Sequence, residues 1–600
     1  MLFSTIPSLI EAQSENRPNC EAIVGLKDLS LNYYPLFGQL QETLSFLNSK
    51  GIGRNDPVAI ILPNGPIMAT AFLSIASCAA SAPLNPSYTA TEYKFYLDDL
   101  QAKAIIVQAD SDSSVIQVAK DLNIPIIYLH ARNKGTTGLF NFSTSMPASQ
   151  ANKSGVAKMS DIALILHTSG TTSRPKMVPL RHKNLCTSAL NICKTLKLTS
   201  EDRCLNIMPL FHIHGLMAAI LASITAGASV ACTPGFYSPM FYEWLDLFKP
   251  TWYTAVPTMH EGILSRAPDN IDIITRNSLR FIRSSSASLP PSVMLNIEKT
   301  FGVPIIEAYG MTEASHQIAC NPLPPEIRKP GSVGLPSGPE VAIMEEENST
   351  LLPKNQLGEI VIRGNNVTLG YMNNEEANQK SFINGWFRTG DQGYIDEDGY
   401  IFLTGRLKEM INRGGEKISP REVDEVLLSH QGVAQAVTFG IDDGFLGEDI
   451  AAAVVIDDPD INENDLKKHV AIRLAPHKIP KRIVFLDEIP KGPTGKLQRI
   501  NLAEQLGLKL KRESKRKISV EYEPPQTDIE KTICDIWQET LNYLKVGIYT
   551  PFRDLGGDSM LATLIHQELE TIFQVNISLV ELYESNTVSE QAKLIERYLK

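Results

Sequence analysis

The 600-residue chain lacks the patterns that indicate a zinc site, a disulfide framework or binding to nucleic acid. Its eight cysteines are scattered and none forms a C-x-x-C pair, so we expect reduced thiols in a cytoplasmic protein. Basic side chains are outnumbered, with 56 Lys and Arg against 67 Asp and Glu and a formal net charge of −11. This balance argues against nucleic acid as a partner, because binding to phosphates requires a basic surface.

Signals for export, peroxisomal import or membrane insertion are missing as well. The N-terminus has neither a basic segment nor a long apolar run, and the C-terminus does not end in a peroxisomal tripeptide. One uncharged stretch, Leu216–Cys232, is shorter than the about 20 residues of a membrane-spanning helix and is rich in small residues. We therefore expect a buried helix followed by a buried strand there, and no membrane span.

What the sequence contains instead is an alternation of strand-like and helical patterns up to about residue 320. Apolar runs such as Val58–Leu62, Ala104–Val107 and Ile162–Leu166 are separated by helical segments, which predicts α/β layers with largely parallel sheets. From about residue 330 to 404, short alternating strands lie between Gly and Asn turns, as in a small antiparallel barrel or sheet.

These patterns predict a multidomain α/β protein, and the length allows roughly three to five domains. We expect a large N-terminal domain of stacked α/β sheets plus a small β-barrel at residues 1–404, and a small α+β domain at 405–507. A charged linker is expected at 508–526. Residues 527–600 combine apolar residues at helical spacing with twelve acidic and six basic side chains, which predicts a four-helix bundle with an acidic surface.

The segment His167–Val178, HTSGTTSRPKMV, is the strongest chemical signal in the chain. It follows the apolar run Ile162–Leu166, and its small residues around Gly170 offer hydroxyls and backbone N–H groups beside the cation of Lys176. Such groups suit the oxygens of a triphosphate. The G-x-x-x-x-G-K-[ST] spacing of a Walker A loop is absent, and a Ser/Thr-rich surface turn is the alternative for such a run taken alone.

The whole run resembles the phosphate loop of the acyl-adenylate-forming superfamily, which includes acyl-CoA synthetases, luciferases and the adenylation domains of peptide synthetases. The resemblance covers roughly residues 10–505. It implies an acid–thiol ligase that depends on ATP and Mg²⁺. The loop residues that it assigns to nucleotide binding are Thr168, Ser169, Gly170, Thr171, Thr172 and Lys176.

A second motif of the superfamily is present at Tyr309–Glu313, which reads YGMTE. The resemblance implies that Tyr309 stacks on adenine, that Thr312 contacts the phosphates at the catalytic centre, and that Glu313 helps to hold Mg²⁺. An aromatic face suits a purine and a hard carboxylate suits Mg²⁺. A third motif, Thr389–Asp391, supplies a carboxylate for the ribose hydroxyls.

The remaining motifs follow in the order that the superfamily requires. Arg406 is implied to contact the nucleotide, and Lys408 occupies the position of the interdomain hinge. Gly414 and Gly415 would line the thiol channel. Lys496, in KGPTGKL, would be the mobile cation that stabilises the transition state between the carboxylate and the α-phosphate.

Two positions of the phosphate loop depart from the superfamily pattern. Ser173 and Met177 stand where Gly is usual, and Ser173 occurs in one branch. If the Gly at the second position serves a positive φ, Met177 would impose strain there. The expected consequence is a change in nucleotide affinity or rate.

The segment Leu555–Met560, LGGDSM, resembles the phosphopantetheine attachment site of carrier proteins. Ser559 would carry the 4'-phosphopantetheine arm, whereas an ordinary helix cap is the alternative for a Ser at this place. A carrier implies a phosphopantetheinyl transferase and a downstream acyl-accepting enzyme as partners. The acceptor thiol is either the arm on Ser559 or free CoA, and the sequence leaves this open.

The run Pro209–Gly215, PLFHIHG, bears on the substrate. Peptide-synthetase domains place an Asp here to hold an ammonium group, whereas this chain has His212, a candidate catalytic residue, so an α-amino acid is disfavoured. Several runs together resemble the oxalate–CoA ligases of plants and fungi. In that branch Ser286 and His316 would bind the distal carboxylate of oxalate or another short dicarboxylate; the alternatives are that Ser286 lines the adenine pocket and that His316 caps a helix.

A catalytically inactive scaffold that binds nucleotide and presents the carrier is the competing hypothesis. It predicts that some of the charged motif residues have been lost, and none has. The residues concerned are Lys176, Glu313, Asp391, Arg406 and Lys496. The scaffold hypothesis therefore depends mainly on Met177.

Overall fold

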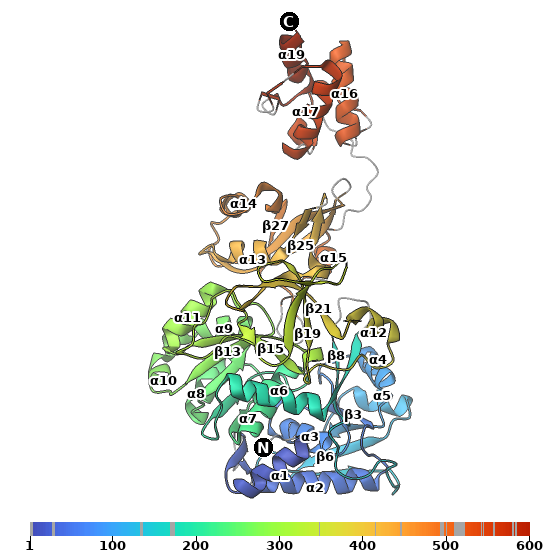
Figure 1. Cartoon of the computed structure of the whole chain (residues 1–600), viewed down its shortest axis with the longest axis vertical. Helices are drawn as coiled ribbons and strands as arrows, with labels where there is room; N and C mark the ends of the chain where they lie inside the picture. Colours follow the sequence, from blue (N-terminus) through green and yellow to red (C-terminus); the bar gives the residue numbers. More distant parts are fainter. Residues whose placement is uncertain are drawn as a thin grey trace. The chain divides into compact units, whose positions relative to one another are not determined.

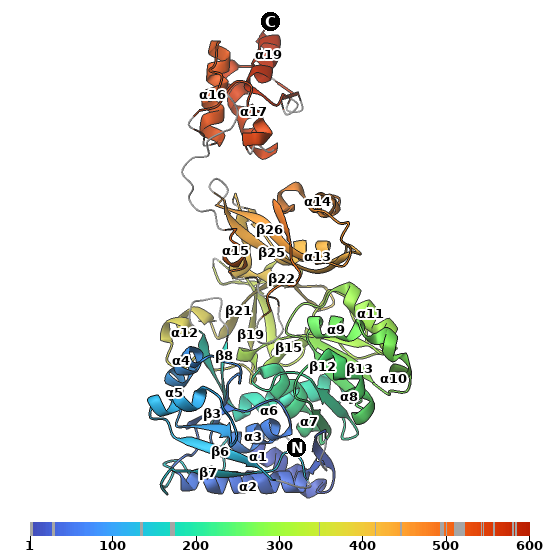
Figure 2. The same cartoon turned by 180° about the vertical axis from the view of Figure 1, so that it is seen from behind.

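The computed structural model of the chain describes residues 4–26, 30–132, 136–168, 175–346, 348–414, 416–443, 447–491, 497, 499, 501–508, 522–541, 543, 545–555, 559–575, 577–578, 581–582 and 585–599. The chain divides into two compact units, Met1–Leu508 and Lys509–Lys600, and each is described by itself. Figure 1 and Figure 2 show their elements from opposite sides.

The first unit contains a nine-stranded sheet whose central strands are all parallel. Its strands in spatial order are β16 (Leu335–Pro336), β15 (His316–Cys320), β14 (Ile305–Met311), β13 (Phe281–Ser285), β12 (Trp252–Ala255), β10 (Arg203–Asn206), β11 (Ser229–Cys232), β1 (Glu21–Val24) and β2 (Leu31–Asn32). Antiparallel strands are found at both edges, where β2 pairs with β1 and where β15 pairs with β14 and β16. The sheet confirms the prediction of largely parallel α/β layers.

A second, seven-stranded sheet has the same design. Its strands in spatial order are β7 (Phe140–Thr144), β6 (Ile126–Ala131), β5 (Ala104–Gln108), β3 (Pro57–Ile61), β4 (Ala80–Pro83), β8 (Ile162–Thr168) and β9 (Lys176–Arg181). The strands from β6 to β8 are parallel, and β7 and β9 are antiparallel edge strands.

Helices cover both faces of these sheets. They are α1 (Ile6–Asn16), α2 (Tyr33–Ser49), α3 (Pro66–Ala76), α4 (Ala90–Leu100), α5 (Val115–Asp121), α6 (His182–Thr195), α7 (Ala222–Ala226), α8 (Phe241–Phe248), α9 (Pro257–Leu264), α10 (Ile271–Thr275) and α11 (Pro291–Phe301). Helices α3, α6 and α7 contribute to one apolar cluster that the inner faces of both sheets share. Helices α8 to α11 cover the outer face of the nine-stranded sheet (Figure 1).

The side chains of β3 show why this arrangement needs continuous apolar strands. Val58 and Ile60 belong to the shared cluster, whereas Ala59 and Ile61 belong to the cluster beneath α4 and α5. Successive side chains of a strand point to opposite faces, so a strand covered on both faces must be apolar throughout. The continuous run Val58–Leu62 reflects this requirement.

The uncharged stretch that begins near Leu216 is buried, apart from the half-buried Ala226. It forms the π-helix η1 (His214–Leu221), then α7, then β11, which confirms the expected order of a buried helix and a buried strand. No helix among the described residues is long and apolar enough to cross a membrane. π-Helices are rare, and those that occur are often found at functional sites. The helix η1 begins at His214, within the PLFHIHG run.

The small antiparallel region predicted after about residue 330 is a six-stranded sheet. It comprises β17 (Glu340–Met344), β18 (Leu351–Leu352), β19 (Gly358–Arg363), β20 (Phe382–Ile383), β21 (Trp386–Ile395) and β22 (Ile401–Arg406), with α12 (Glu375–Ser381) before β20. All of its pairings are antiparallel.

The last part of the first unit is α+β, as predicted, with apolar clusters on both faces of its sheet. Its elements are β23 (Ile411–Arg413), β24 (Glu416–Ile418), α13 (Pro420–Leu428), β25 (Val433–Asp443), β26 (Gly447–Ile456), α14 (Glu463–Ala471), β27 (Arg482–Phe485) and α15 (Leu502–Gln505). The 3₁₀ turns among the described residues have three or four residues each. Those of the first unit are η2 (Ser238–Met240), η3 (Ala267–Asn270), η4 (Thr312–Ala314), η5 (Leu407–Glu409) and η6 (Pro476–Lys478), and η7 (Phe552–Leu555) lies in the second unit.

The second unit is helical around its own core. Its described helices are α16 (Asp528–Leu541), α17 (Ser559–Phe573) and α19 (Val588–Leu599). Trp537 is fully buried in this core, and its indole Nε1–H donates to Gln591 Oε1 at 3.0 Å. The bond joins α16 to α19 and satisfies the one polar group of the indole.

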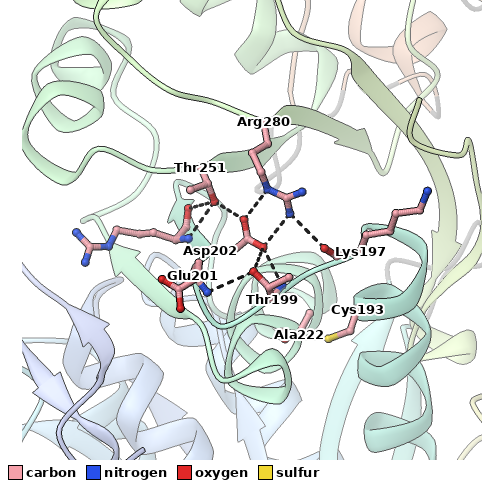
Figure 3. Close-up of polar contacts among 9 residues, drawn as sticks. Cys193, Lys197, Thr199, Glu201, Asp202, Ala222, Thr251 and Arg280 are labelled. Carbon is pink, nitrogen blue, oxygen red and sulfur yellow. Dashed lines mark hydrogen bonds and ion pairs between the residues drawn. The ribbon is translucent and has the colours of Figure 1, made fainter. Parts of the chain in front are cut away.

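A network of hydrogen bonds around Asp202 links the residues that precede β10, β12 and β13, at the amino ends of these parallel strands (Figure 3). Asp202 is 3% exposed and accepts hydrogen bonds from Arg280 Nε and Nη2, both at 2.8 Å, from Thr251 Oγ1 at 2.7 Å and from the Thr199 backbone N–H at 2.8 Å. Burial alone would raise the pKa of Asp202, but these donors, Arg280 first, hold it below its usual value. The carboxylate is therefore charged and fully satisfied.

We predict that Asp202→Asn lowers the thermal unfolding midpoint of the first unit. The asparagine has no charge and cannot accept all the hydrogen bonds that the buried carboxylate accepts, which should lower the free energy of unfolding by about 1–3 kcal/mol. Asp246→Asn is the matched control, because Asp246 also pairs with an arginine, Arg276, through two oxygens, but at the surface. Calorimetry should show a clear drop for the first variant and little change for the second, and equal drops would contradict the assignment.

Candidate active site

Three of the predicted nucleotide residues meet at the carboxylate of Asp391. The Tyr309 hydroxyl donates to Asp391 Oδ2 at 2.5 Å, and Arg406 Nε donates to Asp391 Oδ1 at 3.0 Å. The charge of Asp391 raises the pKa of Arg406, and burial, together with that charge, raises the pKa of Tyr309. These residues come from β14, β21 and β22, so the tertiary structure joins motifs that are far apart in the sequence.

The backbone of the Thr-Gly-Asp turn is fixed by the sheet around it. Gly390 has a φ of +73°, and its N–H donates to Glu359 Oε1 at 2.9 Å. Thr389 Oγ1 donates to the carbonyl of Ile360 at 2.7 Å and accepts from the Asp391 N–H at 3.1 Å. The glycine permits the left-handed turn, and these bonds hold Asp391 in position.

A second group surrounds Glu313, which is 6% exposed. The Tyr371 hydroxyl donates to Glu313 Oε1 at 2.8 Å, and Lys176 Nζ lies 4.4 Å from the centroid of the Tyr371 ring. Burial raises the pKa of Glu313, whereas Tyr371 and Lys176 oppose this shift. The motifs of the sequence did not include Tyr371, which no spacing rule would have identified.

Lys176 lies in a partly buried position where positive charge gathers. Burial lowers its pKa, the nearby charge of Lys408 lowers it further, and Glu313 raises it. Two lysines that repel each other beside one carboxylate suit a polyanionic ligand such as a triphosphate. Thr312, in η4, precedes Glu313 directly.

The strands β8 and β9, which flank the predicted phosphate loop in the sequence, pair in antiparallel fashion. Thr168 pairs with Lys176 and His167 with Met177 across the two strands. The predicted phosphate ligands Ser169, Gly170, Thr171 and Thr172 lie outside the described residues.

The structure corrects the expectation of strain at Met177. The residue lies in the regular antiparallel strand β9 and is absent from the residues with positive φ. Its side chain is 4% exposed and packs in the cluster that also contains Ile61 and Ile165. Methionine at this position therefore fills a core site and imposes no left-handed backbone.

The two residues implied for a distal carboxylate, Ser286 and His316, meet at a third residue. Ser286 Oγ lies 3.0 Å from His214 Nδ1, and the rings of His214 and His316 stack with centroids 4.9 Å apart and an interplanar angle of 24°. His212 Nδ1 accepts from the backbone N–H of His214 at 3.3 Å, at the start of η1. The motif pattern did not single out His214, although it stands in the PLFHIHG run, because spacing alone does not separate it from His212.

The alternatives considered for His316 can now be compared with its position. His316 is the first residue of β15 and follows the turn η4, so it caps no α-helix. The backbone here is constrained, because Ser286, Ser315 and His316 have φ values of +75°, +51° and +91°. Such values are costly for residues other than glycine and gather at functional sites.

Gly310 explains how the chain reaches this conformation. A Cβ atom at position 310 would lie 1.7 Å from the carbonyl oxygen of His316. Only glycine permits this close approach of β14 and β15, so the glycine of YGMTE serves to position His316 as well as the motif itself.

The predicted residues of the C-terminal part are only partly described. Lys408 lies in η5 and Gly414 has a φ of +58°, whereas Gly415 and Lys496 lie outside the described residues. Ser559 is the first residue of α17, and its side chain lies outside the described set. No group of three or more His, Cys, Asp or Glu that could hold a metal occurs in the described part of the chain.

The comparisons with known proteins identify an ATP-dependent acid–thiol ligase. Residues 10–372 match the AMP-binding enzyme family, residues 422–496 its C-terminal domain, and residues 531–595 the phosphopantetheine attachment site. The chain therefore belongs to the AMP-binding enzyme family and carries a C-terminal carrier domain.

Named relatives and solved structures agree with this membership. The chain is 42% identical to the oxalate–CoA ligase of Arabidopsis thaliana over 506 residues, which cover 83% of this chain and 98% of the plant enzyme. It is 40% identical to the oxalate–CoA ligase of Saccharomyces cerevisiae over 539 residues, with 83% and 95% covered. The structure of ATP-bound MatB from Rhodopseudomonas palustris matches with a TM-score of 0.75 and 26% identity, over 83% of this chain and 98% of that one.

We predict that Met177→Gly destabilises the first unit without improving ATP binding. Removing a buried methionine side chain costs about 2–5 kcal/mol, and glycine in a strand adds to this cost. Met177→Leu, which nearly conserves volume, is the matched control and should behave as the wild type. Thermal unfolding and ATP titration test this together, and tighter ATP binding by the glycine variant would show that methionine does strain the loop.

Proposed function

We propose that the enzyme activates a small dicarboxylic acid, with oxalate as the first candidate, and transfers its acyl group to a thiol. The convergence of Ser286, His214 and His316 carries this proposal, because hydroxyl and imidazole groups at one point suit a second carboxylate. The names of the plant and yeast relatives, both oxalate–CoA ligases, support it. The π-helix η1 brings His214 into this group.

The nucleotide is proposed to bind along the two groups around Asp391 and Glu313. Asp391 would accept from the ribose hydroxyls, with Tyr309 on the adenine and Arg406 beside them. The loop Thr168–Thr172 and Lys176 would bind the phosphates. Magnesium fits Glu313, because Mg²⁺ is commonly held by one or two carboxylates together with substrate phosphates, and when bound it would neutralise phosphate charge.

The reaction is proposed to follow two steps. A carboxylate oxygen of the acid attacks the α-phosphorus of ATP, and pyrophosphate leaves with the bonding electrons. Lys496 would stabilise the charge that builds up at this phosphorus, and Thr312 and His212 would line the reacting centre. Next, a thiolate attacks the acyl carbon of the adenylate and AMP leaves, after rotation of the C-terminal part about Lys408 has brought Gly414 and Gly415 to the thiol channel.

The carrier domain supplies one of the two candidate thiols. We propose that Ser559, at the start of α17, carries the 4'-phosphopantetheine arm and that the tether gives this thiol a high effective concentration. Free CoA is the other acceptor, which the ligase relatives favour. A transferase that installs the arm, a downstream enzyme that removes the acyl group and a cytoplasmic location complete the proposal.

The inactive scaffold loses its main support. It rested on Met177, which occupies an ordinary strand position. The described charged residues of the motifs, Lys176, Glu313, Asp391 and Arg406, lie in two groups that suit catalysis.

We predict acid-dependent ATP–pyrophosphate exchange that is highest with oxalate. The panel should contain oxalate, malonate, acetate, longer fatty acids, aryl acids and amino acids, because these differ in size and in the charge of the distal group. Highest exchange with another class of acid would overturn the substrate proposal and leave the family assignment intact. No exchange with any acid, from folded protein that binds ATP, would revive the scaffold hypothesis.

We predict that Ser559→Ala leaves this exchange unchanged and removes all covalent acyl loading. The variant lacks the oxygen to which the arm is attached, whereas the adenylation site is in the other compact unit. The protein is first incubated with a phosphopantetheinyl transferase and CoA, the donor of the arm, and free CoA is removed. Intact-protein mass spectrometry after addition of ATP and acid then measures the loading. Ser578→Ala, another serine of the second unit, is the matched control, and loading that survives in Ser559→Ala would place the attachment elsewhere.

A further inference from the structure

A fully buried arginine lies behind the group that we propose for the distal carboxylate. Arg283, on β13, is 0% exposed. Its guanidinium contacts Thr254 Oγ1 at 3.4 Å, His214 Nε2 at 3.5 Å and Gln317 Oε1 at 3.4 Å. No carboxylate contacts it within the described part of the chain, and an isolated buried charge is costly unless something compensates it.

The neutral contacts of Arg283 do not provide that compensation. All three are long for hydrogen bonds to a cation, which are usually about 2.7–2.9 Å. Burial lowers the pKa of Arg283, and the nearby thiols of Cys320 and Cys204 oppose the shift. Arginine nevertheless keeps its proton in proteins, so a positive potential persists at this point of the sheet.

The contacts of Arg283 favour one direction for the hydrogen bonds that start there, because its guanidinium also lies 3.5 Å from His214 Nε2 and that nitrogen must then accept. Arginine can only donate, so Thr254 Oγ1 accepts from it and donates its own proton to His214 Nε2 at 2.6 Å. A proton on His214 Nε2 would face the protons of Thr254 Oγ1 and Arg283 Nη1, so we assign the proton of the neutral imidazole to Nδ1. His214 Nδ1–H then donates to Ser286 Oγ at 3.0 Å.

The series of hydrogen bonds ends at the hydroxyl of Ser286, which accepts from His214 and keeps its own proton for another partner. Ser286 Oγ accepts from His214, and the Ser286 side chain is only half-buried, whereas His214 and Thr254 are fully buried. Ser286 can therefore donate outward. The positive φ of Ser286 fixes this presentation, since the backbone there cannot relax without cost.

We propose that Arg283, Thr254 and His214 form a donor chain that makes Ser286 a hydrogen-bond donor to the second carboxylate and supplies the positive field for it. The proposal rests on the dicarboxylate function proposed above and assigns its selectivity for an anionic distal group to buried residues. Arg283 and Thr254 are positioning residues, because they act through His214 and Ser286. Gln317 helps to hold the guanidinium, since its own Nε2 donates to Ser337 O at 3.1 Å and to Thr195 Oγ1 at 3.2 Å.

Thr254→Val is the variant that tests the donor chain. It keeps the shape of the side chain but removes both the donor to His214 Nε2 and the acceptor for Arg283. The KM for oxalate in pyrophosphate exchange should rise about tenfold or more. Without Thr254 Oγ1, His214 no longer directs Ser286 to donate, and the hydrogen bond from Ser286 to the charged second carboxylate is lost. The KM values for ATP and for acetate, which has no second carboxylate, should stay within about twofold of the wild type, a difference too small to reflect a lost bond.

Two further variants separate this role from a structural one. Thr254→Ser retains the hydroxyl and should restore most of the oxalate affinity. Ser284→Ala is the matched control, because it removes a buried hydroxyl from the same strand, next to Arg283, outside the donor chain. Arg283→Met should also lose selectivity for oxalate over acetate, and Thr254→Val still decides the question if the Arg283 variant does not fold.

The outcomes distinguish this inference from the proposed function. If the wild type prefers oxalate and Thr254→Val keeps that preference, the donor chain is wrong and the function stands. If Thr254→Val weakens oxalate and acetate equally, Thr254 has only a structural role and the inference fails. If the wild type does not prefer a dicarboxylate, both the substrate proposal and this inference are overturned, and the family assignment remains.

Discussion

The parallel register of the nine-stranded sheet is the constraint on which the rest of the molecule depends. Thr254 pairs with Arg283 across β12 and β13, and Ser285 pairs with Ala308 across β13 and β14. Strands β12 and β13 therefore end within one residue of each other, and the loops after the carboxyl ends of parallel strands meet at one edge of the sheet. A shift of one residue would turn Arg283 to the other face and separate it from His214.

The two ends of these strands serve different purposes. The residues that precede β10, β12 and β13 are Asp202, Thr251 and Arg280. Their hydrogen bonds to one another hold the amino ends of these strands together. The opposite edge, where the parallel strands have their carboxyl ends and the antiparallel β15 begins, holds the left-handed residues Ser286 and His316. Stabilising interactions at one edge allow strained conformations at the other, where the substrate is proposed to bind.

Positive charge gathers at the two predicted binding sites, although the chain as a whole is negatively charged. The protein has a net charge of −11, yet Lys176 lies near Lys408 and the buried Arg283 has no carboxylate beside it within the described residues. Anions would relieve both situations, a triphosphate at the first and a distal carboxylate at the second. The acidic side chains of the second unit are instead suited to docking on basic partner surfaces.

The sequence by itself determined the class of enzyme, the α/β fold and the carrier domain, because short motifs and apolar periodicity are local properties of the chain. It also predicted the meeting of Tyr309, Asp391 and Arg406 at a nucleotide site, although the roles of these residues, of Lys496 and of Ser559 stay predictions. Only the tertiary structure placed His214 and Tyr371 against predicted site residues and Arg283 behind His214, and it removed the strain expected at Met177. These depend on contacts between distant segments, which strand register decides and motif spacing does not encode.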